Sequence, residues 1–246
     1  MYYPGAVSLD VQIWSDIACP WCYIGKRRFE RALANFPQRD QVTVHWRSYQ
    51  LDPSLPDHDH RSEVEYLVAA KGLPVHSVEG MVRHVTEQAA GEGLDYDFDA
   101  LVVANSRRAH RVLQAAKRAD AVDGAGRTDR LKEALLSAHF EGGLNIGDVE
   151  VLTELAEAAG LTAAQARAAV GSDDLDDAVA RDIAEAAAIG VRGVPFFVFD
   201  GRYGVSGAQP PEVFLQALEV SWAERTPALI TIDGATGEAC GPDGCA

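Results

Sequence analysis

The first fifty residues alternate between the hydrophobic periodicities of strands and of a helix. Residues 9–15 form a mainly apolar run that predicts a buried or half-buried strand. Residues 20–36 carry Phe29, Leu33 and Phe36 at helical spacing with charged residues between them, and Pro37 ends this helix. Residues 42–47 alternate apolar and polar positions, which predicts a second strand. This succession predicts a βαβ unit with parallel strands and a right-handed crossover.

The strand pattern is absent between residues 52 and 171. This region is rich in Ala, Leu, Glu and Arg, and glycines divide it into short segments of high helix propensity. Asp148 and Thr162 stand where N-terminal capping residues are expected. We therefore expect an inserted helical region, with helices near residues 62–72, 77–92, 99–122, 127–141, 148–159 and 162–170.

Strands return after a further helix that is expected at residues 175–189. Pro195 opens an apolar strand that ends at Phe199, Asp200 and Gly201 form a two-residue hairpin turn, and residues 202–205 form the returning strand. Residues 211–222 carry apolar side chains along one side and form the closing helix. The expected fold class is therefore α/β. We divide the chain into a discontinuous domain (1–51 and 172–223), an inserted helical domain (52–171) and a C-terminal tail (224–246).

Charge and hydropathy exclude several classes of partner. The chain of 246 residues has 22 Lys and Arg against 37 Asp and Glu, a formal charge of −15. This balance argues against nucleic acid, which requires a basic face, and against adhesion to an anionic membrane. The N-terminus lacks the features of a secretory signal, and no apolar run is long enough for a membrane span. We expect a cytoplasmic protein, in a compartment where persistent disulfides are rare.

A Cys-x-x-Cys motif, Cys19 to Cys22, lies where the first strand gives way to the first helix. Unpaired N–H groups at a helix N-terminus favour an anion, so we expect the pKa of Cys19 to fall from about 8.5 into the range of about 3.5–7.5. Cys22 follows about one turn later, within reach for a disulfide. A redox dithiol is favoured, with Cys19 as nucleophile and Cys22 as resolving thiol. The alternative is a zinc site completed by Cys240 and Cys245, which the Pro-Trp interior fits less well.

Four segments carry a resemblance to a known family. They are SDIACPWCYIG (residues 15–25), NSRRAH (105–110), GVRGVPFF (190–197) and VSGAQ (205–209). In the expected order of elements, they resemble the DsbA group of disulfide oxidoreductases, and within it the cytoplasmic FrnE branch, over about residues 8–222. The resemblance implies a thioredoxin fold, with the large helical region inserted between its βαβ and ββα halves.

The resemblance also implies a cis peptide bond between Val194 and Pro195, facing the dithiol. A proline that opens a strand supplies no N–H, which leaves a neighbouring carbonyl free to receive a substrate backbone. We expect Pro20 and Trp21 to tune the redox potential, and Trp21 to offer substrates an apolar contact. Asp16 is a candidate for proton transfer, although a role as a turn or capping residue explains it equally well.

A second cysteine pair, Cys240 and Cys245, flanks a turn-rich Gly-Pro-Asp-Gly segment. Some FrnE-type proteins carry such a pair, so the resemblance implies an auxiliary dithiol that exchanges electrons with the first. Adventitious oxidation in a disordered tail and metal binding are the alternatives. Asn105 and His110 match the family pattern, although a helical histidine is more often a packed side chain than a catalytic one. Residues 58–60, His-Asp-His, are expected to form a solvated loop, and we predict no metal site.

The sequence thus predicts a protein-disulfide oxidoreductase, with isomerase activity as an extension. We expect no dissociable cofactor, with glutathione as a candidate thiol partner. The expected substrates are proteins or small molecules that bear disulfides or thiols, and the chain is a monomer or dimer. One rival is a glutathione-dependent enzyme resembling the kappa transferases or hydroxychromene carboxylate isomerases, which typically place Ser where this chain has Cys19. The other is a zinc-binding or chaperone module, which stoichiometric zinc would reveal.

Overall fold

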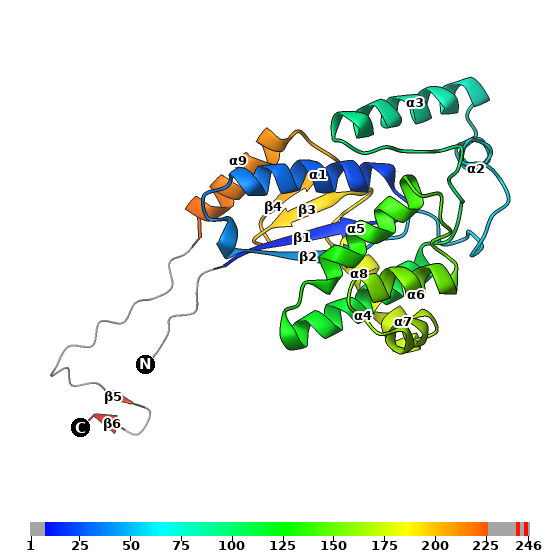
Figure 1. Ribbon diagram of the computed structural model, residues 1–246. Coiled ribbons are helices and arrows are strands. Elements are labelled where there is room, and N and C mark those ends of the chain that lie inside the picture. The colour runs from blue at the N-terminus through cyan, green and yellow to red at the C-terminus, as the bar shows by residue number, and fades with distance from the viewer. Residues whose placement is uncertain (1–7, 226–239, 242–243, 246) are drawn as a thin grey trace.

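The computed structural model describes residues 8–225, 240–241 and 244–245 (Figure 1). The strands are β1 (Leu9–Ser15), β2 (Val42–Ser48), β3 (Phe196–Phe199), β4 (Tyr203–Ser206), β5 (Cys240–Gly241) and β6 (Gly244–Cys245). The helices are α1 (Pro20–Asn35), α2 (Glu63–Lys71), α3 (Val75–Gly91), α4 (Arg107–Asp123), α5 (Arg127–Phe140), α6 (Val149–Ala158), α7 (Ala163–Val170), α8 (Asp173–Ala188) and α9 (Pro211–Ala223), and a 3-10 turn, η1 (Arg39–Gln41), precedes β2. No helix in this described part combines the length and the hydrophobicity that a membrane crossing requires.

The central sheet has the strand order β2-β1-β3-β4. β1 pairs with β2 in parallel, with Val11 opposite Val44, and with β3 in antiparallel fashion, with Val11 opposite Phe199. β3 and β4 form an antiparallel hairpin. The parallel pair confirms the predicted βαβ unit, and the hairpin followed by α9 confirms the predicted ββα unit. The fold is therefore the expected mixed α/β fold of the thioredoxin type with a helical insertion between β2 and β3.

The alternation of side chains along β1 places a core on each face of the sheet. Val11 and Ile13 are buried in a cluster that includes Phe29 of α1 and Phe214 of α9. Trp14 points to the opposite face, where it belongs to a separate buried cluster with residues of α8 and β3. Figure 1 shows α1 and α9 together on one side of the sheet and α8 on the other. Successive residues of one strand thus hold both helical layers in place.

The inserted helices pack against the start of α1. Ile17, just before the dithiol, is fully buried in a cluster formed by α4 to α8. Tyr23 of α1 is buried in another cluster with side chains of α3 and α5, and its ring stacks on Tyr96 with a centroid separation of 6.2 Å. The Tyr96 hydroxyl donates to the Pro20 carbonyl over 2.7 Å. The inserted helices therefore hold in place the end of α1 that carries the cysteines. The division of the chain into domains given in the sequence analysis stays a prediction.

The prediction of a helix from residue 99 is wrong, because α4 begins only at Arg107. The preceding residues are not helical, and two of them bond to a distant loop: the Val103 carbonyl accepts from the Asp59 N–H over 2.8 Å, and the Asn105 N–H donates to the Pro56 carbonyl over 2.9 Å. These long-range backbone bonds replace the helical ones that local propensity favours.

The hairpin between β3 and β4 is also longer than predicted. Asp200 and Gly201 both adopt the left-handed conformation, with φ of 52° and 65°. The Arg202 N–H closes the turn by donating to the Phe199 carbonyl over 3.0 Å. However, strand pairing resumes only at Tyr203, so the connection has three residues, 200–202, instead of two. The turn chemistry is as expected, and the extra residue is Arg202.

Candidate active site

The two cysteines occupy the first turn of α1. Cys19 is the N-cap residue, and Pro20 takes the first helical position, where a backbone N–H has no helical partner. The Cys22 N–H donates to the Cys19 carbonyl over 3.0 Å. Both thiols are free and buried, with Cys19 4% and Cys22 1% exposed. The predicted position of the motif at a strand-to-helix junction is confirmed.

The Val194–Pro195 peptide bond is cis, as predicted, and its loop lies against the dithiol. The Cys19 thiol donates to the Val194 carbonyl with an S···O distance of 3.5 Å. The Pro195 carbonyl accepts from the Gly207 N–H over 2.8 Å, which ties this loop to the end of β4. Gly25 allows the close approach of α1, because a Cβ there would lie 2.8 Å from Cγ of Pro195. Glycine at this position therefore lets the helix and the loop meet.

The pKa values of the two thiols change in opposite directions, and the lowered pKa is on the cysteine that the prediction did not name. The interaction with the neighbouring Cys22 sulfur, together with burial and the negative charge of Asp16, raises the pKa of Cys19 well above its ordinary value. Burial opposes ionisation of Cys22 as well, but the interaction with Cys19 and the positive charge of Lys132 outweigh it and lower the pKa of Cys22. The expectation of a low pKa at Cys19 is therefore wrong in this arrangement: the lowered pKa belongs to Cys22, which interacts with Cys19 and with the positive charge of Lys132.

Asp16 belongs to a buried polar cluster beneath the dithiol. Its carboxylate lies 3.2 Å from Nε2 of His110 and accepts from the Leu51 N–H over 2.7 Å and from the Ala18 N–H over 3.3 Å. Burial opposes its ionisation, but the interactions with His110, the Leu51 N–H and the Ser106 hydroxyl lower the pKa of Asp16 overall. Burial lowers the pKa of His110, so its neutral ring donates Nε2–H to the carboxylate. The predicted carboxylate is thus in place, and α4 supplies its partner.

Lys132 is a functional candidate that the sequence reasoning missed. Its side chain comes from α5 and is fully buried, with Nζ 5.4 Å from the centre of the Trp46 ring. Burial lowers the pKa of Lys132 to about 8, and the negative charges of Cys22 and Asp16 limit that fall. The ammonium group therefore provides positive charge in a region that water does not reach, where it favours a thiolate.

A signal for Lys132 does exist in the sequence. Lys132, Leu135, Leu136 and His139 follow a spacing of three, four and seven residues, which places them on one face of a helix. All four are buried in the structure. Two titratable side chains on an apolar helix face indicate a buried polar site, but the sequence does not show that this face meets the dithiol.

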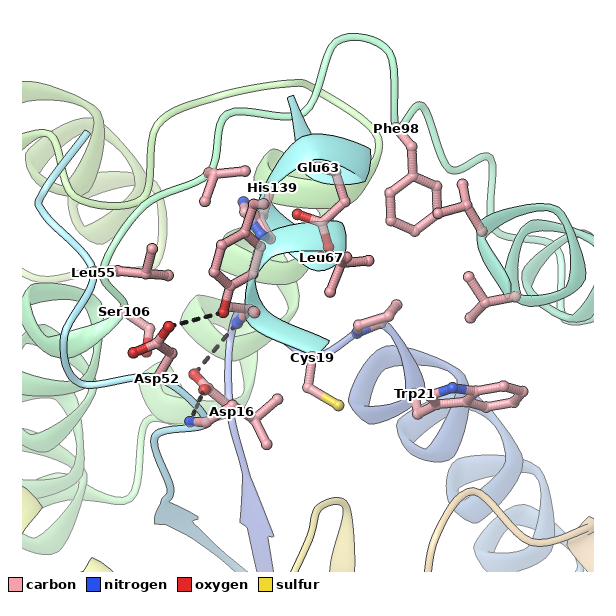
Figure 2. Close-up of a pocket in the computed structure, with 18 of the residues that line it drawn as sticks. Asp16, Cys19, Trp21, Asp52, Leu55, Glu63, Leu67, Phe98, Ser106 and His139 are labelled. Atoms are coloured by element: carbon pink, nitrogen blue, oxygen red, sulfur yellow. Dashed lines mark hydrogen bonds between the residues drawn. The ribbon is translucent and has the colours of Figure 1, made fainter. Parts of the chain in front are cut away.

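Trp21 lies between the dithiol and α3. Its side chain is partly exposed, and its ring centre lies 5.9 Å from that of His84. Together with Cys19, Pro20 and Val194, it borders a cavity of about 530 Å³ that extends towards α2 and α3. Figure 2 shows Cys19 and Trp21 at one part of this cavity and Glu63 and His139 at another. The predicted substrate-contact residues therefore surround one space, which has the volume of a small-ligand site.

The second cysteine pair, Cys240 and Cys245, is described in its backbone only. The backbones of β5 and β6 pair in antiparallel fashion with Cys240 opposite Cys245, but their side chains lie outside the described residues. An auxiliary redox role for them stays a prediction. In residues 58–60 the two histidine rings lie 4.8 Å apart, and the described part of the chain contains no group of three or more metal-ligating side chains.

Comparison with known proteins identifies relatives of this chain. A solved structure from Streptomyces coelicolor, a probable DsbA oxidoreductase, is 45% identical with a TM-score of 0.82, covering 97% of this chain and 98% of that one. The uncharacterized protein YwbO of Bacillus subtilis is 24% identical over 217 residues, 86% of this chain and 96% of its own length. The cytosolic disulfide reductase DsbM of Pseudomonas aeruginosa, solved with glutathione, shares the fold at 19% identity and a TM-score of 0.59, covering 87% of this chain and 99% of that one.

The family model that describes the DSBA-like thioredoxin domain matches residues 10–219. This range contains the central sheet apart from Leu9, the inserted helices, both cysteines of the Cys-x-x-Cys motif and the cis-proline loop. The chain therefore belongs to the DSBA-like thioredoxin-domain family.

Proposed function

We propose that this protein is a dithiol–disulfide oxidoreductase whose redox centre is Cys19 and Cys22. The observation that carries the proposal is the division of labour between the two thiols. Cys19 borders the cavity and donates to the Val194 carbonyl, whereas Cys22 is the more deeply buried and has the lowered pKa. The Cys19 sulfur is thus positioned to contact a substrate, and the Cys22 sulfur is the proposed acceptor of the Cys19 proton.

The exchange begins when the Cys19 thiol loses its proton, for which the neighbouring Cys22 sulfur, with its lowered pKa, is the proposed acceptor. The Cys19 thiolate then attacks one sulfur of a substrate disulfide, which forms a mixed disulfide and expels the other substrate sulfur as a thiolate. That thiolate takes up a proton, and Cys22 loses one to solvent. Attack of Cys22 on the Cys19 sulfur closes the protein disulfide and releases the second substrate thiol. Two electrons pass from the protein to the substrate, and the reverse sequence oxidises a dithiol.

Lys132 and the Asp16–His110 pair influence these exchange steps without contacting the substrate sulfurs. The charge of Lys132 favours each step that leaves a thiolate on Cys22, whereas the negative charge of Asp16 raises the pKa of Cys19 and opposes ionisation there. The carbonyl of Val194 accepts from the Cys19 thiol in the resting state and is free for a substrate N–H once that thiol has reacted.

The finer parts of the proposal rest on the sequence motifs. We infer a protein of the cytoplasmic FrnE type, in which Pro20 and Trp21 tune the potential and Cys240 and Cys245 serve as an auxiliary dithiol. The antiparallel register that sets these two cysteines opposite each other supports a paired role. The binding of glutathione to the related DsbM supports a small thiol as the electron partner.

The test is equilibration of the full-length protein in glutathione redox buffers, followed by alkylation and mass spectrometry of each cysteine. We expect Cys19 and Cys22 to titrate together as a two-electron couple between about −270 and −120 mV, the range of known exchangers. A double Cys240→Ser and Cys245→Ser variant separates the contribution of the second pair. Glutathione binding without thiol exchange would instead favour the transferase or isomerase alternative. Protection of the thiols until a chelator is added would favour a metal site.

A further inference from the structure

The cavity beside Cys19 has mostly apolar walls. Helix α2 contributes Leu67 and Ala70, and the partly exposed Met81 lies on α3. The remaining apolar side chains come from the loops and helices around them: Leu51, Leu55, Val82, Val85, Phe98, Val103, Ala104 and Val194. The surface that this cavity offers to a ligand is therefore largely hydrocarbon.

The charged groups of the cavity are predominantly negative. Asp16, Asp52 and Glu63 line it, against the single cation Lys71. Asp16 is held by the His110 cluster, and Asp52 accepts from Ser54 and from the Tyr66 hydroxyl.

Glu63 differs from the other two carboxylates. Within the described part of the chain its side chain makes neither a hydrogen bond nor an ion pair, and the charge that acts on it comes from Lys71. Figure 2 shows its carboxylate directed into the cavity, between α2 and Phe98. Burial raises the pKa of Glu63 to about 7, because the surrounding apolar groups solvate its charge poorly. A ligand cation at this position would supply the ion-pair partner that the described part of the protein does not provide for Glu63.

His139 provides an independent polar group that lacks a partner. It lines the same cavity, is 2% exposed, and its Nδ1 atom is buried without a hydrogen bond. Burial lowers the pKa of His139 to about 4, so the ring is neutral at neutral pH. A nitrogen of a neutral imidazole that lacks its proton accepts from an ammonium group.

We propose that this cavity selects low-molecular-weight disulfides in which one sulfur carries an apolar arm with a terminal ammonium group, and that it disfavours anionic disulfides such as that of glutathione. The apolar walls receive the arm, Glu63 pairs with the ammonium group, and His139 is the neighbouring acceptor. A small substrate fits because Cys19 is 4% exposed and the adjoining space is about 530 Å³. This inference rests on the proposed dithiol exchange.

The chemistry is the exchange already described, with the cationic arm on the sulfur that Cys19 attacks. The mixed disulfide joins Cys19 to the arm, and the other half of the substrate leaves as a thiolate that takes up a proton. Cys22 then displaces the arm as the second thiol. The protein loses two electrons and the substrate disulfide gains them. The cavity acts on the rate of the first attack by binding the arm during it.

The experiment compares three symmetrical disulfides of equal arm length: those of 6-aminohexanethiol, 6-mercaptohexanol and 6-mercaptohexanoic acid. The rate at which each oxidises the reduced full-length protein is measured at about pH 8 by acid quenching, alkylation and mass spectrometry of Cys19 and Cys22. Each rate is divided by the rate of the same disulfide with free dithiothreitol, which removes intrinsic reactivity. We expect the order amine, alcohol, acid, with glutathione disulfide slower than the alcohol.

Two variants of α2 isolate the local effect of Glu63 from the overall negative charge. Glu63→Gln and Glu65→Gln each remove one negative charge, but Glu65 is exposed, lies outside the cavity and caps the helix start, a role that Gln can also fill. We expect Glu63→Gln to lower the amine-to-alcohol rate ratio by about tenfold, as for loss of one partner of a partly buried charge pair. Glu65→Gln should leave the ratio unchanged.

The outcomes separate the inference from the function on which it rests. If none of the disulfides oxidises Cys19 and Cys22, the dithiol-exchange function is wrong. If all react but with equal normalised rates, or if the acid or glutathione disulfide is fastest, the function stands and the cationic selection is wrong. Equal losses in Glu63→Gln and Glu65→Gln would likewise overturn the role of Glu63, because they would show attraction by net charge alone.

Discussion

Lys132 is a buried cation whose own ionisation opposes folding. Its pKa is about 8 against an ordinary value of 10.5, and that difference corresponds to about 3 kcal/mol at about 1.4 kcal/mol for each pH unit. Lys132→Met removes this cost and keeps an unbranched apolar side chain against the Trp46 ring. We expect the reduced variant to be more stable than the wild type at pH 7 by up to about 3 kcal/mol.

The sign of the pH dependence follows from the direction of the pKa change. Below about pH 8, Lys132 is protonated in the folded and the unfolded protein, so the whole cost is present. Between about pH 8 and 10.5 the folded protein has released this proton, while the unfolded chain still binds it. The stability contributed at this site therefore rises with pH in the wild type. The advantage of Lys132→Met should shrink across the same window.

The same substitution should weaken the redox centre. Without the lysine charge, the pKa of Cys22 rises and the pair holds less thiolate at neutral pH. The assay combines urea unfolding of the reduced proteins at about pH 7 and 9.5 with the pH profile of iodoacetamide alkylation, read by mass spectrometry. We expect higher stability at pH 7 together with several-fold slower alkylation. This opposition of stability and reactivity distinguishes an electrostatic role from a packing role.

Arg39→Met is the matched control, because it removes one positive charge from an exposed position in η1, outside the cavity beside Cys19. It should change the stability and the alkylation profile little. The reasoning would be refuted if Lys132→Met were less stable than the wild type at pH 7, or if its alkylation profile coincided with that of the wild type. Either result would mean that Lys132 does not carry its charge next to the dithiol.

Further predictions concern the packing of α1 and the buried carboxylate. Gly25→Ala should destabilise the protein by about 1–3 kcal/mol in thermal unfolding, because the new Cβ meets Cγ of Pro195 at 2.8 Å. Gly80→Ala, within α3 and 3.8 Å from its nearest neighbour, should instead stabilise by about 0.5–1 kcal/mol. Asp16→Asn should speed alkylation of Cys19 at pH 7, since the charge of Asp16 raises the pKa of that thiol. The pKa of Asp16 is lower in the folded protein than in the unfolded chain. The stability that its carboxylate contributes is therefore present above about pH 4 and is lost as the pH falls further. The urea unfolding midpoint of Asp16→Asn should depend less on pH in this acidic range than that of the wild type.

Much of the fold could be predicted because its signals are local. Hydrophobic periodicity, capping residues and turn residues placed most helices and strands within a few residues of their positions. The helix predicted from residue 99 failed because Asp59 and Pro56, some 45 residues earlier, bond to the backbone of residues 103 and 105. Local propensity contains no term for such a partner. The hairpin loop is also one residue longer than its turn residues indicate, because strand pairing resumes only at Tyr203.

The sequence by itself determined that two cysteines open a helix after a strand, and that a Val-Pro strand follows the helical insertion. Only the tertiary structure decided which groups surround these cysteines. It brings Lys132 and His110 from two helices into the buried surroundings of the dithiol and of Asp16, and Glu63 from a third helix to the cavity beside Cys19. It also places the lowered pKa on Cys22 instead of Cys19. The physical reason is that desolvation and Coulomb interactions depend on distances in space and on exclusion of water. Neither quantity is a property of spacing along the chain.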